Sequence, residues 1–172
     1  MLLWFAGLSV IVVWQVFRDT AIDYRLVMAG ALAADVVDAA FGGVGPLHTL
    51  VGSAILLTAV MLATRGRRGL RRWLLALPIG TFLHLALDAM WTRTTVFWWP
   101  LFGRSFGDDG VGLPSLARSP ALVAVQELAG AVALVWFFRR FDLADPQRRR
   151  HFLQTGRLDR ELGRPSPRVS DP

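Results

Sequence analysis

Cysteine is absent from this sequence. Its absence excludes disulfides, thiolate metal sites and a cysteine nucleophile, and leaves the redox compartment undetermined. Lysine is also absent, so all 19 basic residues are arginines. The chain has no internal repeat and no glycine-rich phosphate loop. Charged residues make up only 19% of it, against 53% hydrophobic residues, and the mean hydropathy is +0.43. These values are typical of a polytopic membrane protein.

Five apolar segments follow one another along the chain, at residues 2–17, 26–41, 47–64, 73–91 and 120–138. A membrane-spanning helix needs about 20 predominantly apolar residues, so the first segment is slightly short. It lacks the basic start and the small-residue cleavage site of a signal peptide, and we interpret it as a retained first helix. The sequence therefore predicts an all-α integral membrane protein, a bundle of about five transmembrane helices.

The arginines gather in two places, which fixes the predicted orientation. Residues 65–72 hold five arginines in eight positions, and the chain after residue 139 is basic again. Such a run could contact nucleic acid, but between two apolar segments it is more typical of the cytoplasmic anchor of a helical hairpin. We expect no nucleic-acid partner. The N-terminus is predicted outside and the C-terminus in the cytoplasm, in a multi-pass protein of the bacterial cytoplasmic (inner) membrane.

The predicted domain organisation has two parts. Residues 1–141 form the transmembrane domain, and residues 142–172 form a basic cytoplasmic tail. Asp145 followed by a proline predicts a helix start, and Gly163 predicts its stop, so we expect a helix over residues 147–162. Its arginines suit the surface of an anionic membrane, and its apolar residues look too sparse for a core. Residues 164–172 are predicted to be disordered.

His84 and Asp88 are four residues apart within an otherwise apolar helical segment. Both side chains therefore project from the same helix face. An imidazole and a carboxylate are costly to bury in such a segment unless they pair, accept hydrogen bonds or bind a ligand. A satisfied pair between packed helices is the simpler alternative to a metal or catalytic site.

Other ionisable residues share this depth. Counting 1.5 Å per residue from the predicted outer helix ends gives roughly 9–11 Å below the boundary for Asp35, His84 and Glu127. Asp38, His48 and Asp88 lie within about one turn of that boundary. The inner halves of the segments have no comparable set. Imidazoles and carboxylates without cysteine suit Zn²⁺, or Mn²⁺ or Mg²⁺ if oxygen ligands dominate. We predict a divalent metal site in the outer leaflet, bound by His48, His84 and Asp88, with Asp35 as a ligand or bridging group.

A metal site at this depth predicts a hydrolase acting on a membrane lipid or a lipid-linked ester or phosphoester. The metal would activate water, and Asp38 or Glu127 could serve as the general base. Trp98 and Trp99 could wall a lipid-facing cleft, although such aromatics more commonly form an interfacial belt. Arg93 or Arg104 could hold a substrate phosphate.

The order of these motifs also resembles a family. An aspartate-rich helix end is followed by a histidine opening the next helix, a basic loop, Gly80-x-x-x-His84-x-x-x-Asp88 and a Trp-Pro-Leu at 99–101. Over residues 29–102 this pattern resembles the YdjM-like inner-membrane proteins, described as LexA-binding, membrane-bound metal-dependent hydrolases. The resemblance implies that activity, with Asp35, His48, His84 and Asp88 at the matching positions.

The chain departs from that family pattern at two points. The family's Pro-Asp-x-Asp reads here as Ala-Asp-Val-Val-Asp at 34–38. Its two histidines ending in Thr-His-Ser read as Leu-His-Thr at 47–49, with no earlier histidine. The resemblance therefore leaves the number of metals open.

Two further functions compete with hydrolysis. A proton relay or small transporter also uses buried Asp, Glu and His, but it predicts polar residues through the whole membrane thickness, and here they stop halfway. A non-enzymatic membrane anchor, whose basic tail recruits a partner or nucleic acid, would leave the outer polar layer without a role. No oligomeric state is predicted.

Overall fold

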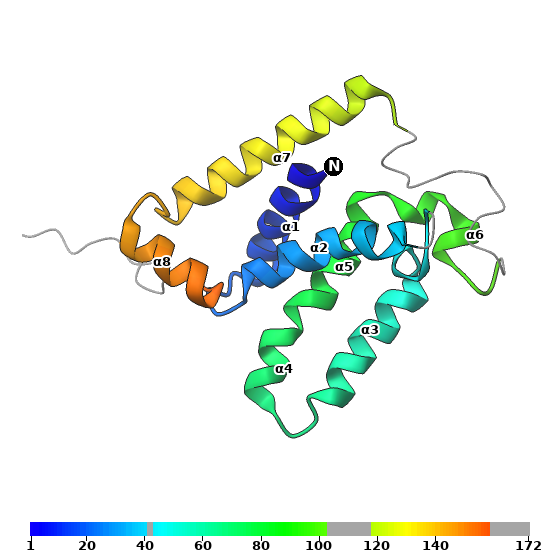
Figure 1. Cartoon of the computed structure of the whole chain (residues 1–172), viewed down its shortest axis with the longest axis horizontal. Helices are drawn as coiled ribbons and strands as arrows, with labels where there is room; N and C mark the ends of the chain where they lie inside the picture. Colours follow the sequence, from blue (N-terminus) through cyan, green and yellow to red (C-terminus); the bar gives the residue numbers. More distant parts are fainter. Residues whose placement is uncertain (41–42, 103–117, 159–172) are drawn as a thin grey trace, which may run out of the picture.

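The structure is a computed structural model that describes residues 1–40, 43–102 and 118–158. These residues form helices joined by short turns, with no strand in the three ranges (Figure 1), so the predicted all-α class is confirmed. The α-helices are α1 (Leu2–Phe17), α2 (Tyr24–Ala39), α3 (Leu50–Ala63), α4 (Arg68–Leu74), α5 (Ala76–Leu87), α6 (Thr94–Phe97), α7 (Pro120–Arg140) and α8 (Pro146–Thr155). Two short 3-10 helices are η1 (Pro46–His48) and η2 (Met90–Thr92).

Two helices in the described part of the chain are long and apolar enough to cross a membrane. One runs through α4 and α5, Arg68–Leu87, over 20 residues, and the other is α7, Pro120–Arg140, with 21 residues. The apolar helices α1 and α3 are shorter, at 16 and 14 residues. The fold therefore provides two candidate membrane spans, and the full five-span arrangement stays a prediction.

Local capping shifts several helix ends from their predicted positions. Helix α2 begins at Tyr24 because the carboxylate of Asp23 accepts the backbone N–H groups of Arg25 and Leu26, an N-cap. Helix α5 ends at Leu87, four residues earlier than expected, because Ala89 adopts a left-handed conformation with φ of 55°. Helix α8 begins after Asp145 as predicted but ends at Thr155, where Gly156 has φ of 70°. The predicted stop at Gly163 lies outside the described residues.

Glycines let two helix pairs touch along their backbones. A Cβ added to Gly30 of α2 would collide with backbone atoms of Leu77 on α5, and one added to Gly80 of α5 would collide with backbone atoms of α2. Gly7 and Gly130 make the same kind of approach between α1 and α7. Small residues that let backbones approach are the usual contact between helices in membranes. The contact at Gly30 and Gly80 sets the spacing between α2 and α5. Helix α2 carries Asp35 and Asp38, and α5 carries His84.

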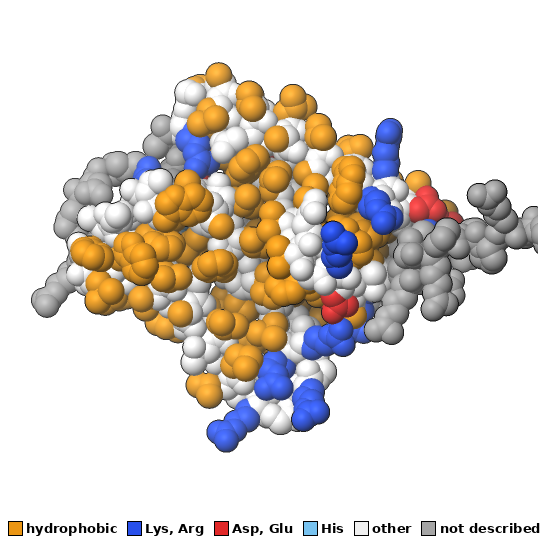
Figure 2. Space-filling model, turned by 180° about the vertical axis from the view of Figure 1, so that it is seen from behind, with side chains coloured by type: hydrophobic (Ala, Val, Ile, Leu, Met, Phe, Trp, Pro, Cys, Tyr) orange, Lys and Arg blue, Asp and Glu red, His pale blue; other side chains and the backbone are white. Residues whose placement is uncertain are grey.

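Helices α3 and α4 form a hairpin that projects from the rest of the molecule, with its turn at the tip (Figure 1). Arginine side chains gather at this tip, at the bottom of Figure 2, whereas hydrophobic side chains cover most of the face above it. The arginine run at 65–72 thus lies where two apolar helices meet in a turn, which is the geometry that the sequence predicted for this run.

The tail helix α8 is part of the hydrophobic core. Phe152 and Leu158 are 8% and 4% exposed and belong to one buried cluster with residues of α1, α2 and α7. The Leu158 N–H donates to the Thr20 carbonyl at 2.9 Å, and the Tyr24 N–H donates to the Gly156 carbonyl at 2.9 Å. The expectation that the tail is too poor in apolar residues to join a core is therefore wrong for Phe152 and Leu158. The tail therefore packs against residues 18–23, which form the hinge between α1 and α2.

Candidate metal site

Three side chains from different elements meet in the interior. Asp35 comes from α2, His48 from the end of η1, and His84 from the last turn of α5. The two Nε2 atoms of the histidines are 3.3 Å apart. Asp35 Oδ1 lies 3.4 Å from Nε2 of His48 and 3.6 Å from Nε2 of His84. The three candidate ligand atoms thus form a nearly equilateral triangle, and one metal ion could contact all three.

The size of this triangle matches a tetrahedral metal. Zn²⁺ binds imidazole nitrogen and carboxylate oxygen at about 2.0–2.2 Å, and tetrahedral angles then separate neighbouring ligand atoms by roughly 3.3–3.6 Å. The three observed separations, 3.3, 3.4 and 3.6 Å, fall in that interval. An ion above the face of the triangle would need little movement of the side chains.

The other ring nitrogen of each histidine is also held in place. His48 Nδ1 lies 2.6 Å from Asp38 Oδ2, and His84 Nδ1 lies 2.7 Å from the carbonyl oxygen of Ala31. A carbonyl only accepts, so the proton of His84 sits on Nδ1, and the carboxylate favours the same tautomer for His48. In neutral rings both Nε2 lone pairs then face each other and the carboxylate of Asp35. Converging acceptors require a shared proton or a cation between them, and this second contact on each imidazole is the usual support of metal-binding histidines.

Asp38 is buried, and both of its carboxylate oxygens have hydrogen-bond partners, which indicates a structural role. Besides the His48 ring, its Oδ2 accepts the backbone N–H groups of Gly45 and His48 at 3.0 and 3.1 Å. Its Oδ1 accepts the N–H of Leu47 at 3.3 Å. A Cβ on Gly45 would lie 2.8 Å from this carboxylate, so only glycine fits there. Asp38 therefore shapes the turn between α2 and α3 and orients His48, whereas the sequence suggested that it was a general base.

The environment leaves one side of the group open. Both histidine side chains are fully buried, and the ring of Phe5 from α1 stacks on His84 with centroids 4.0 Å apart. The side chain of Asp35 is 20% exposed. A ligand or substrate would therefore reach the group over Asp35, while Phe5 of α1 covers His84.

Asp88 is not brought into this group, although it follows His84 by one turn. Asp88 is the C-cap of α5, and its Oδ1 pairs with Arg118 Nη2 at 2.8 Å. Arg118 also donates to the Asp88 carbonyl oxygen at 3.1 Å. The other carboxylate oxygen, Oδ2, is buried without a hydrogen-bond partner among the described residues. The structure therefore gives Asp88 an arginine partner that no local pattern in the sequence indicated.

Glu127 and the predicted substrate-binding residues lie apart from the three-residue group. Glu127 on α7 accepts the backbone N–H of Leu3 at 3.0 Å, which ties it to the start of α1. The remaining predictions were Arg93, Trp98, Trp99 and Arg104. The first three flank α6, where Arg93 and Trp99 are half-buried and Trp98 is 40% exposed. Arg104 lies outside the described residues.

Comparison of this chain with family models, curated proteins and solved structures gives no match. The resemblance to the YdjM-like family therefore stays a prediction from the motif order. The function is therefore inferred from the geometry of Asp35, His48 and His84.

Proposed function

We propose that the protein is a membrane-bound metal-dependent hydrolase whose divalent metal, with Zn²⁺ first and Mn²⁺ or Mg²⁺ as alternatives, is held by Asp35, His48 and His84. The observation that carries this proposal is the triangle of ligand atoms with sides of 3.3–3.6 Å. Three protein ligands with one coordination position left open is the arrangement of catalytic zinc sites, whereas structural sites are closed by four.

A metal bound there would supply a water of lowered pKa and polarise a phosphoryl or acyl oxygen. The chain contributes the geometry around it. The Asp38 carboxylate and the Ala31 carbonyl hold the two imidazoles in the tautomer with Nε2 free. Phe5 excludes water from the His84 side, and the partly exposed Asp35 marks the side of approach. Asp88, held by Arg118 one turn beyond His84, carries a buried carboxylate oxygen with no partner in the described part of the chain, and this oxygen is our candidate acceptor for a proton.

We further propose that the chain is a multi-pass protein of the bacterial inner membrane with the site in the outer leaflet, acting on a lipid or lipid-linked ester. The arginine-rich turn between α3 and α4 supports this orientation, since the candidate ligands lie at the opposite ends of α3 and α5. Because the chain has no cysteine, single cysteines test it directly. Arg67→Cys should be protected from an impermeant reagent added outside intact cells, and Leu101→Cys should be labelled. The reverse pattern would invert the topology.

Metal content tests the functional proposal. Mass spectrometry of the detergent-purified protein should find stoichiometric zinc or manganese in the wild type and little in His84→Ala. The matched control is His151→Ala, because His151 lies on the exposed side of α8 and outside the ligand group. Wild-type protein that stays folded and metal-free after exposure to excess zinc and manganese would remove the basis for a hydrolase.

One observation favours a second candidate, a proton relay. A separation of 3.3 Å between the Nε2 atoms of His48 and His84 is close to the upper limit of an N–H···N hydrogen bond, so one shared proton could replace the metal. In that case the purified protein would bind no stoichiometric metal, and His84→Ala would appear only as lower thermal stability.

A further inference from the structure

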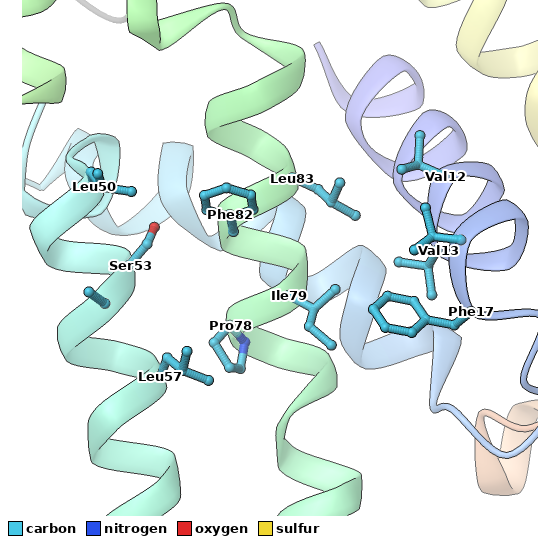
Figure 3. A pocket seen from close by; sticks show the side chains of 12 residues that line it. Val12, Val13, Phe17, Leu50, Ser53, Leu57, Pro78, Ile79, Phe82 and Leu83 are labelled. Carbon is cyan, nitrogen blue, oxygen red and sulfur yellow. The ribbon is translucent and has the colours of Figure 1, made fainter.

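An apolar groove lies between α1, α3 and α5, with a volume of about 450 Å³. Figure 3 shows its walls: Ser53 and Leu57 project from α3, Ile79 and Phe82 from α5, and Val13 and Phe17 from α1. Ser53 is the one polar residue among those that line it. Small-molecule sites have volumes of about 300–1,000 Å³, so the groove is large enough to hold a ligand.

The groove opens onto an apolar surface. Among its rim residues Val16, Leu57 and Phe82 are 68%, 43% and 50% exposed. On α3 the neighbouring Ile55 and Leu62 are 62% and 65% exposed. A patch of this kind on helices of an apolar chain is unfavourable in water and is explained by contact with lipid. The molecule that can enter the groove sideways is therefore a hydrocarbon chain.

Positive charge lies at one end of the groove. Phe17 lines it, and the next residue is the exposed Arg18. Arg72 of α4 pairs with Asp19 at 2.9 Å, which ties the helix after the arginine-rich turn to the segment that follows α1. In Figure 2 the arginines at the tip of this hairpin border the hydrophobic face. The topology proposed above places this end on the cytoplasmic side, where arginines beside an apolar groove are the expected receptor for an anionic lipid head group.

We propose that this groove binds one acyl chain of an anionic phospholipid from the inner leaflet, with its phosphate at Arg18 and the arginines of the α3–α4 turn. The proposed metal site is separate, since Ile79 and Phe82 face the groove whereas Gly80 and His84 of the same helix face α2. A lipid bound there would fill the space between α1 and α3 and pack against α5.

Retained lipid tests this proposal without reference to hydrolysis. The full chain would be reconstituted in nanodiscs with equal amounts of phosphatidylglycerol and phosphatidylcholine, and native mass spectrometry would identify what stays bound after ejection. Phosphatidylglycerol should be retained. Ala54→Trp, which fills the groove from an exposed lining position, should reduce retention about tenfold, and Ala59→Trp, exposed on α3 but outside the groove, should not. Arg18→Gln should lower the preference for phosphatidylglycerol about fivefold.

Ser53→Ala distinguishes an acyl chain from a polar ligand. The Ser53 hydroxyl is buried and lacks a hydrogen-bond partner among the described residues. An acyl chain makes no hydrogen bond, so removing the hydroxyl should leave retention unchanged. Loss of binding in Ser53→Ala, equal retention of the two lipids, or full retention in folded Ala54→Trp would each overturn the proposal. None of these outcomes depends on the metal content that tests the hydrolase.

Discussion

The Nε2 atoms of His48 and His84 lie 3.3 Å apart, although 36 positions separate the two residues in the chain. Each ring is held at its other nitrogen by a group from α2, the Asp38 carboxylate for His48 and the Ala31 carbonyl for His84. Helix α2 therefore orients both imidazoles and also supplies Asp35 as the third candidate ligand. A metal would meet ligand atoms that are already positioned, which reduces the ordering required on binding.

Asp38→Asn should weaken metal binding without removing a ligand. The amide cannot favour the Nδ1–H tautomer of His48 as a carboxylate does, and loss of such supporting groups typically lowers metal affinity about 10–100-fold. Zinc titration against a competing chelator would measure the change. Asp142→Asn is the control, because Asp142 is 59% exposed and distant in the fold, on the turn before α8. Equal affinities in the two variants would show that Asp38 does not act through His48.

Asp88→Ala should keep the metal, because Asp88 pairs with Arg118 instead of joining the three ligands. Arg118→Ala should destabilise the protein more strongly, since it leaves a buried carboxylate unpaired, at a cost of about 3–5 kcal/mol. Thermal melts and metal analysis of both variants would separate the two effects. Metal loss in Asp88→Ala would restore the ligand role that its spacing from His84 predicted.

Gly80→Ala should push α5 away from α2. The new methyl group would collide with backbone atoms of Val27 and Ala31, and overpacking of this kind costs about 1–3 kcal/mol. Because the Ala31 carbonyl also holds His84, metal affinity should fall together with the melting temperature. Gly69→Ala is the control: nothing lies within 4 Å of its added Cβ, so it should be neutral or slightly stabilising. Similar melting temperatures for the two variants would contradict the backbone contact.

Some of this arrangement follows from the sequence and some does not. The helical segments, the helix start after Asp145 and the meeting of Asp35, His48 and His84 could be predicted, because periodicity, capping and a shared depth are local or countable properties. The pairing of Asp88 with Arg118 could not be predicted, since Arg118 lies just before α7 and no spacing rule links the two residues. The hydrogen bonds of Asp38 could not be predicted either, because they come from a turn whose path no periodicity encodes.

Acid should destabilise the hinge between α1 and α2 through Asp23, the N-cap of α2. Burial by itself raises the pKa of this carboxyl, but hydrogen bonds from Arg25 at 2.9 Å and Trp73 at 2.8 Å outweigh it and hold that pKa below its usual range. A lowered folded pKa stabilises the protein above the unfolded value, about 3.9, and this contribution disappears as the pH falls through the folded value.

Melting temperatures between pH 6 and pH 3, a range chosen to bracket the ordinary carboxyl pKa of about 3.9, would measure this effect. Asp23→Asn should be less stable near neutral pH and should lose less stability on acidification than the wild type. The matched change Asp145→Asn replaces one good N-cap with another at α8 and should alter stability near neutral pH little. Parallel profiles for wild type and Asp23→Asn would contradict the role of Asp23.

Phe152→Ala should destabilise the whole fold, although it lies in the tail. Phe152 is 8% exposed within the cluster formed with α1, α2 and α7, and truncating a buried phenylalanine costs about 3–5 kcal/mol. Leu153→Ala is the control, because Leu153 is 62% exposed. Chemical unfolding in mild detergent would compare them. Equal stability would mean that the tail does not contribute to the core.

The closure of the α1–α2 hinge by α8 also constrains how the protein assembles. The Tyr24 N–H and the Thr20 carbonyl find their partners at Gly156 and Leu158, and Arg25 donates to the Leu153 carbonyl 128 positions away. During synthesis these N-terminal groups emerge long before their partners exist. The contacts between this segment and α8 can therefore form only after α7 and α8 have been synthesised, so this junction is completed late in biogenesis. A quality-control protease that recognises an open hinge would discriminate finished chains from those interrupted before α8.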